Sequence, residues 1–244
     1  MLLYIIIGLF VGLIMGLTGA GGALAAIPLL IGLLSLSLRD ATTLSLVIVI
    51  MSTLINLIGL RPKLNLRLVL TLVSAGAIGN VLSVNKKNEI PDYVVATLII
   101  SIGIYGLLSV WRERRELGAK QEKQGPIKSV IIGLLLGILT TLTGLGGGVV
   151  LMPVLMNFFG MNYQEALGNG LASILLISVM SFIFQWGEVS SLISLSELAL
   201  ITFGSFISVL LIKKLPPEML KFRKILFTLV VVYSTVSIMR SVWI

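Results

Sequence analysis

The stretch GLFVGLIMGLTGAGGALAAIPLL at residues 8–30 returns 125 positions later, without a gap, as GLLLGILTTLTGLGGGVVLMPVL at residues 133–155. Over the 34 positions that start at residue 8, 11 are identical between the two copies, and five of these identities are glycines. Chance matches between leucine-rich segments do not reproduce glycines at fixed spacing. The sequence therefore predicts one unit used twice, with a first membrane repeat at 1–111, a charged linker at 112–128 and a second membrane repeat at 129–244.

The composition is that of a membrane protein. Of the 244 residues, 57% are hydrophobic and 11% are charged, against roughly 25% charged residues in soluble domains. A signal peptide would supply only one short apolar segment near the start. Here, uncharged runs of the length that is typical of membrane spans occupy 1–38, 41–60, 68–85, 93–111, 129–164 and 166–187. We therefore expect an all-α polytopic membrane protein.

The residue types that the chain lacks exclude most enzymes. There is no cysteine and no histidine, which removes thiol nucleophiles, thiolate and imidazole metal ligands and the usual proton shuttle. A membrane enzyme would have to rely on serine, threonine or carboxylates near the helix ends. No catalytic residue, metal or cofactor is expected. The net charge of +8 is attributed to membrane topology and lipid contact rather than to nucleic acid binding.

Each copy opens with an uncharged run that is too long for one straight helix, since residues 2–38 would extend more than about 50 Å. Glycine clusters interrupt both runs, and a helix breaks easily at glycine. We expect each copy to begin with two half-helices joined at a glycine turn, followed by three spans. The predicted half-helices are 2–17, 23–37, 129–142 and 149–161, and the predicted spans are 41–60, 67–85, 91–111, 166–187, 192–212 and 220–242.

The positive-inside rule indicates how the copies are oriented. If the two half-helices together add an even number of crossings, the loops of one face carry 14 Lys and Arg residues and those of the other face carry 4. An odd number would give 10 against 8. The even count is favoured, and it makes the two copies inverted repeats. The face with more Lys and Arg residues, which includes the linker 112–128, is predicted to be cytoplasmic. The two chain termini are predicted to be outside, as are Lys86 and Lys87.

Inverted repeats with broken helices are typical of secondary transporters, in which half-helix N-termini near the midplane point at anionic groups. Free backbone N–H groups, the helix dipole and the small size of glycine together suit the close approach of a small oxyanion. Polar side chains in the apolar runs can complete such a site. The predicted substrate-binding residues are Thr18, Gly19, Ala20, Gly21, Gly22, Ser45, Thr143, Gly144, Leu145, Gly146, Gly147, Gly148, Asn169 and Ser173.

Other small or polar residues have a structural interpretation. Gly8, Gly12 and Gly16 show the four-residue spacing of close helix packing. Asp40 and Glu165 stand at the starts of spans, where an acidic side chain caps free amides. Ser45 and Asn169, taken singly, more often form a hydrogen bond between helices than a contact with a ligand. No ionisable residue is expected deep in any apolar run, so the charge of a bound anion would respond to the membrane potential.

The repeated pattern of Gly-x3-Gly, then Thr-Gly-x-Gly-Gly, then an apolar run with Pro28 or Pro153 resembles the sulfite exporter TauE/SafE family of membrane permeases over nearly the whole chain. The resemblance implies a bacterial or archaeal cytoplasmic-membrane transporter that moves sulfite, sulfoacetate or related sulfur-containing anions, usually outward. It places the substrate at the two glycine turns. The implied partners are a small inorganic or organosulfur anion and membrane lipids, and a homodimer is left open. An anion channel, or a permease for another small organic anion, is the alternative.

Overall fold

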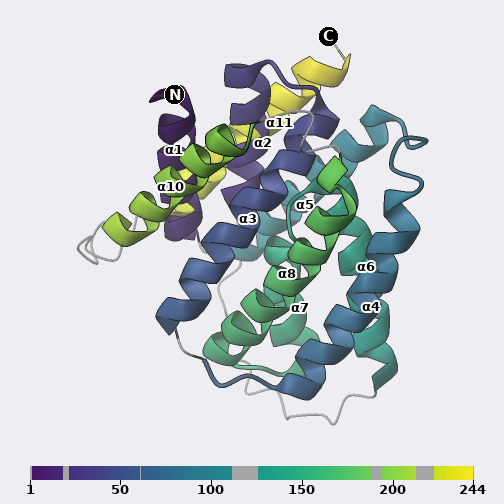
Figure 1. Ribbon diagram of the computed structural model, residues 1–244. Helices are drawn as coiled ribbons and strands as arrows, with labels where there is room; N and C mark the ends of the chain where they lie inside the picture. The colour runs from purple at the N-terminus through teal and green to yellow at the C-terminus, as the bar shows by residue number, and fades with distance from the viewer. Residues whose placement is uncertain are drawn as a thin grey trace.

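The computed structural model describes residues 2–18, 22–60, 62–111, 126–187, 194–212 and 223–243. Within these ranges the chain forms a bundle of α-helices without any strand (Figure 1). The helices are α1 (Leu2–Thr18), α2 (Gly22–Leu34), α3 (Leu38–Leu60), α4 (Leu66–Val84), α5 (Asp92–Trp111), α6 (Pro126–Thr143), α7 (Gly148–Phe159), α8 (Tyr163–Phe184), α10 (Leu195–Ile212) and α11 (Arg223–Trp243). The predicted all-α fold is confirmed.

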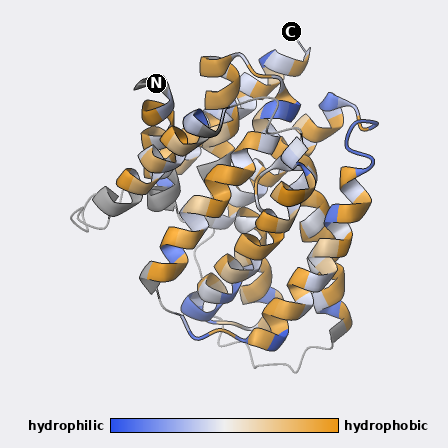
Figure 2. Ribbon diagram, viewed as in Figure 1, coloured by the Kyte–Doolittle hydropathy of each residue, from blue (hydrophilic) through white to orange (hydrophobic). Residues whose placement is uncertain are grey.

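Five of these helices are long and apolar enough to cross a membrane, and they are α3, α4, α5, α8 and α11. The middle of the bundle is predominantly apolar, and polar residues collect near the helix ends and in the loops (Figure 2). Large apolar side chains also face outward, such as Phe10, which is 59% exposed, and Ile127, which is 72% exposed. Contact of such side chains with lipid is favourable, whereas their exposure to water is unfavourable. The protein is a multi-pass membrane protein.

The two arms of each broken helix differ in length. α1 and α6 have 17 and 18 residues, whereas α2 and α7 have 13 and 12. α6 begins at Pro126, inside the predicted linker, and extends about 27 Å at 1.5 Å per residue, close to the roughly 30 Å of a hydrocarbon core.

Caps hold the starts of two spans, as predicted for their acidic residues. The Asn162 side chain accepts a hydrogen bond from the Glu165 N–H at 2.9 Å, and the Glu165 carboxylate accepts one from the Asn162 N–H at 3.2 Å. At the start of α3 the Asp40 N–H donates to the Ser37 hydroxyl, which donates to the Asp40 carboxylate at 2.7 Å. These side chains satisfy amides that the helix leaves unpaired.

Two helix pairs pack through glycine. α1 lies along α10, and α6 lies along α4 (Figure 1). A methyl group built on Gly8 or Gly12 of α1 would overlap the α10 backbone, and one built on Gly137 of α6 would overlap the carbonyl of Gly76. The hydroxyl of Ser205 donates across the first pair to the Gly8 carbonyl at 3.1 Å. The packing interpretation of Gly8 and Gly12 is confirmed.

These two pairs are built from corresponding segments of the two copies, but they differ in register. Gly8 lies against Ile201, and its counterpart Gly133 lies against Leu72. The counterpart of Ile201 is Gly76, four residues beyond Leu72. Two further pairs of contacts show the same offset. Gly12 lies against Ser205, whereas its counterpart Gly137 lies against Gly76. Gly204 lies against Ile5 and Leu9, whereas its counterpart Gly79 lies against Leu134 and Ile138. Four residues are one helical turn, or about 5.4 Å along the axis.

Replacing Gly137 by valine is expected to destabilise the fold by about 1–3 kcal/mol, the usual range for an overpacked contact. The added atoms meet the α4 backbone, which cannot turn away as a flexible side chain can. Gly170→Ala on α8 is the control, because its new methyl group meets nothing within 3.6 Å. Thermal unfolding of the two purified variants in one detergent measures the difference, and equal midpoints would contradict the packing described here.

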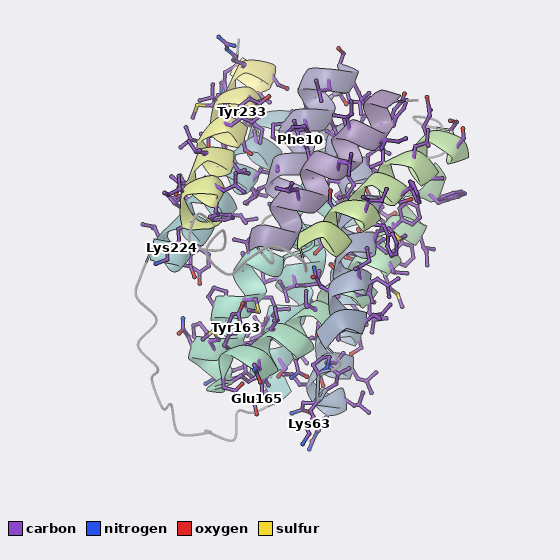
Figure 3. All side chains as sticks on the ribbon, turned by 90° about the vertical axis from the view of Figure 1, so that its left-hand side faces the viewer. Phe10, Lys63, Tyr163, Glu165, Lys224 and Tyr233 are labelled. Carbon is purple, nitrogen blue, oxygen red and sulfur yellow. The ribbon has the colours of Figure 1, made fainter. Side chains whose placement is uncertain are left out.

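The start of α1 and the end of α11 lie at the same end of the bundle (Figure 1). Lys63 and Glu165 lie at the opposite end (Figure 3). The inverted relation of the copies, the cytoplasmic side of the bundle and the repeat boundaries stay predictions. Residues 112–125 of the linker lie outside the described residues.

Candidate functional site

A tight turn joins α6 to α7, and three of its glycines have a left-handed backbone. The φ angles of Gly144, Gly146 and Gly147 are +66°, +66° and +68°, values that side chains other than glycine rarely tolerate. The Gly144 N–H donates to the Thr140 carbonyl at 2.9 Å and ends α6. The Leu151 N–H donates to the Gly147 carbonyl at 2.8 Å and begins α7. Residues 141–149 are all buried, so the predicted break lies inside the bundle.

The turn carries backbone donors without a protein acceptor. In the part of the chain that the structure describes, the N–H groups of Gly146, Gly147, Gly148 and Val149 donate to no protein atom. They form the N-terminal end of the 12-residue helix α7, where the first N–H groups and the positive end of the helix dipole coincide. Such an arrangement binds anions.

Two buried hydroxyls beside the turn also lack a partner. The Thr140 Oγ1 atom on α6 and the Ser178 Oγ atom on α8 have no hydrogen-bond partner, and both residues are 0% exposed. A methyl group built on Gly146 would lie 3.2 Å from Ser178 Oγ, and one built on Gly147 would lie 3.7 Å from Thr140 Oγ1. Leaving a buried hydroxyl unpaired costs about 1–3 kcal/mol. Both hydroxyls are therefore free to hydrogen-bond to a group bound at the turn.

Thr140 and Ser178 are not among the sequence-predicted site residues. Ser178 does belong to a helical series on α8, since Ser178, Ser181 and Gln185 fall three and four residues apart on one face. That series is the signal that could have found it. Nothing in the sequence separates Thr140 from its neighbour Thr141, whose hydroxyl donates to the Asn80 side chain at 3.0 Å.

Ser45 and Thr143 lie at the turn, but their hydroxyl protons serve the backbone. The Ser45 hydroxyl on α3 lies 2.7 Å from the Thr42 carbonyl and 2.9 Å from the Gly144 carbonyl. The Thr143 hydroxyl donates to the Leu139 carbonyl at 2.6 Å and accepts a long 3.4 Å contact from the Leu145 N–H. These two residues hold the turn in shape, and Ser45 does so from the other copy.

Asn169 and Ser173 belong to a different contact. The Asn169 carbonyl oxygen accepts from the Asn65 N–H at 2.7 Å, and its amide donates to the Glu165 carbonyl at 2.8 Å. The Ser173 hydroxyl donates to the Asn169 carbonyl at 2.8 Å. Asn169 thereby ties the connection between α3 and α4 to the first turns of α8, about 13 Å along the helix from Ser178.

The corresponding turn of the first copy joins α1, which ends at Thr18, to α2, which begins at Gly22. The predicted site residues Gly19, Ala20 and Gly21 lie outside the described residues. The first half of the predicted site therefore stays a prediction.

A helical membrane bundle in which a broken helix carries unpaired main-chain donors is typical of membrane transporters. The chain matches the family model of the sulfite exporter TauE/SafE over residues 4–237. It belongs to that family, which is a family of membrane transporters and not of enzymes. No curated protein and no solved structure matches the chain.

Proposed function

We propose that the protein exports small sulfur-containing oxyanions, such as sulfite, thiosulfate or an organosulfonate, across the cytoplasmic membrane. One observation carries this proposal. Four free N–H groups and two unpartnered hydroxyls, those of Thr140 and Ser178, meet at one buried turn. A sulfite or sulfonate group has three oxygens that accept several hydrogen bonds at once, and it fits a set of converging donors.

The charge of the ligand follows from the donors at the turn. They are backbone amides and neutral hydroxyls, and the side chains that a methyl group on Gly146 would meet belong to Val49, Ile174 and Ser178. The turn therefore offers partial positive charge without a titrating group of its own. An anion that crosses alone gains or loses about 2.3 kcal/mol per charge for each 100 mV of membrane potential.

We further propose that the turn of the first copy faces this one from the other side of the membrane. Two polar residues of α3 support a duplicated site. Thr53 occupies the position that corresponds to Ser178, and Asn56 corresponds to Ser181. The Nδ2 atom of Asn56 is buried without a hydrogen-bond partner, as Ser178 Oγ is. Each copy thus places an unsatisfied donor on the same face of corresponding helices.

The difference in register between the two helix pairs favours alternating access over a static channel. In two inverted copies, exchanging the two registers turns one conformation into an alternative related to it by the pseudo-two-fold axis in the membrane plane, with access on the opposite side. The slide amounts to one turn, a step that packed helices are known to take. The contact of α4 with α6 runs through Gly76, Gly79, Gly133 and Gly137, and small residues of this kind let two helices approach closely.

Spin labels test this movement. The chain has no cysteine, so a Leu66→Cys plus Ile127→Cys variant takes one label at the start of α4 and one at the start of α6, both at exposed positions. Double electron–electron resonance in liposomes is expected to give two distance populations whose ratio changes when sulfite is added. One population, unchanged by sulfite, would favour the channel.

Flux into proteoliposomes tests the function itself. Purified protein is reconstituted and supplied with radiolabelled sulfite, thiosulfate or sulfoacetate under a potassium diffusion potential. We expect uptake of at least one of these anions, and we expect the rate to rise when the liposome interior is made positive. Absence of flux for all three anions, or a rate that ignores the potential, would contradict the proposal.

A further inference from the structure

The side chain of Asn80, on α4, joins the two helices that carry the unpartnered hydroxyls. Its Nδ2 atom donates to the Ile177 carbonyl of α8 at 3.0 Å, and its Oδ1 atom accepts from the Thr141 hydroxyl of α6 at 3.0 Å. Ile177 immediately precedes Ser178, and Thr141 immediately follows Thr140. One side chain of the first copy therefore holds α6 and α8 next to both unpartnered hydroxyls.

This bridge belongs to a polar cluster inside the bundle, where α4, α6 and α8 pack side by side (Figure 1). The Thr141 hydroxyl lies 3.1 Å from the Ser181 hydroxyl, which accepts from the Gln185 amide at 3.0 Å. Asn80 and these three side chains are at most 1% exposed. Buried amide and hydroxyl groups are unfavourable without partners. A movement of α4 that breaks these bonds must therefore supply Asn80 with a new partner.

The first copy shows what that partner would be. Ser205 of α10 occupies the position that corresponds to Asn80, and its hydroxyl donates to the Gly8 carbonyl of α1 at 3.1 Å. The counterpart of Gly8 is Gly133 of α6. The register of α4 on α6 differs by one turn from that of α10 on α1. A slide of α4 into the register of the first copy therefore brings Asn80 to the Gly133 carbonyl and breaks its present bonds.

The bond between Asn80 and Thr141 has no equivalent in the first copy, because the counterpart of Thr141 is Gly16, which carries no hydroxyl. The two registers thus differ in hydrogen bonding as well as in packing. The observed register of α4 gives Asn80 a hydroxyl on α6 and a carbonyl on α8. The alternative register replaces both by a carbonyl on α6, so it also releases α8 from α4 beside the glycine turn.

We propose that Asn80 is a positioning residue that couples the register of α4 on α6 to the anion site. This inference rests on the proposed function. In the observed register, Asn80 keeps the Thr140 and Ser178 hydroxyls at the glycine turn, where they bind the anion. After the slide it donates to the Gly133 carbonyl, the two hydroxyls are no longer held at one place, and the anion is released.

Thr141 offers the sharpest test, because its hydroxyl can be removed at nearly constant shape. Thr141→Val removes the hydroxyl, and Thr141→Ser keeps it. Each is placed in the spin-labelled Leu66→Cys plus Ile127→Cys protein, which is the parent. Without sulfite, we expect Thr141→Val to raise the second distance population about tenfold relative to the one that matches the structure, the effect of losing one hydrogen bond. Thr141→Ser should stay within about threefold of the parent.

Asn80→Ser tests the other end of the same bond. Serine is the residue of the first copy at this position, and there it bonds a glycine carbonyl, but it is too short to bridge α6 and α8. Asn80→Ser should shift the distance populations as Thr141→Val does. Both variants should also raise the half-saturating sulfite concentration in proteoliposomes about tenfold. Ser83→Ala, one turn further along α4, is the control and should change neither measurement, since the Ser83 hydroxyl bonds its own helix.

Folded Thr141→Val and Asn80→Ser proteins with the parent populations and wild-type half-saturation overturn the coupling, and so does a Thr141→Ser protein that behaves like Thr141→Val. A shift of the populations with unchanged half-saturation overturns it as well, because Asn80 would then set the register without positioning the site. In each of these cases the wild-type flux still supports the proposed function. If wild type carries none of the three anions, the proposed function fails, and the coupling to an anion site fails with it.

Discussion

Replacing Gly146 by valine is expected to reduce anion flux to the level of empty liposomes. The φ angle of +66° at this position is strained for any side chain and most strained for a β-branched one. The first added carbon would lie 2.5 Å from Val49 Cγ1 and 3.2 Å from Ser178 Oγ. Valine therefore collides with the side chains around the turn and distorts the backbone that carries the free N–H groups. Radiolabelled sulfite uptake by reconstituted protein measures the loss.

The control for this variant is Gly170→Ala on α8, which adds a methyl group where the nearest atom is 3.6 Å away. Its flux should equal that of wild type, and its stability should be unchanged or higher, because glycine inside a helix is about 0.5–1 kcal/mol less favourable than alanine. A Gly146→Val protein that elutes as a single species and transports sulfite like wild type would place the site elsewhere.

Removing the two unpartnered hydroxyls is expected to stabilise the substrate-free protein and to weaken anion binding. Ser178→Ala and Thr140→Val delete buried polar atoms that no protein group satisfies. Each should raise the free energy of unfolding by about 1 kcal/mol, because an unpaired buried hydroxyl is unfavourable. Each should also raise the half-saturating sulfite concentration about tenfold. Thermal unfolding with and without sulfite measures both effects on one sample.

Removing a ligand-binding hydroxyl should raise the free energy of unfolding and lower the affinity for sulfite, whereas removing a structural hydroxyl should not change the two in opposite directions. Ser83→Ala on α4 serves as the comparison, since the Ser83 hydroxyl already donates to the Gly79 carbonyl at 2.7 Å. That variant should lose a little stability and keep its affinity for sulfite. If Ser178→Ala behaves in the same way as Ser83→Ala, the Ser178 hydroxyl has no role at the anion site.

The sequence predicts the fold well because the deciding signals are local. Glycine clusters break the two long apolar runs where the structure ends α1 and α6. Charge-free runs mark the spans, and acidic residues at their starts form the caps at Asp40 and Glu165. Each of these features depends on residues within one or two helical turns, so it can be recognised without knowledge of the neighbours in space.

The candidate site is predicted less completely, because its side chains are selected by contacts between distant segments. Lys87, in the turn after α4, is buried and its neighbour Lys86 is exposed, although no local pattern separates the two. Ser45 reaches the turn of the other copy, whereas Asn169 is drawn to Asn65. The one-turn difference in register is likewise a property of helix pairs, and the sequence of a single helix does not contain it.

The central claim is that the unpaired donors at the turn between α6 and α7 hold the transported oxyanion. Selenite tests it directly, because it shares the shape and charge of sulfite and selenium scatters anomalously. A crystal structure of the protein soaked in selenite should show an anomalous peak at the turn, with selenite oxygens about 2.7–3.2 Å from the N–H groups of Gly146 to Val149 and from Ser178 Oγ. Peaks confined to the charged ends of the bundle, with none at the turn, would contradict the account.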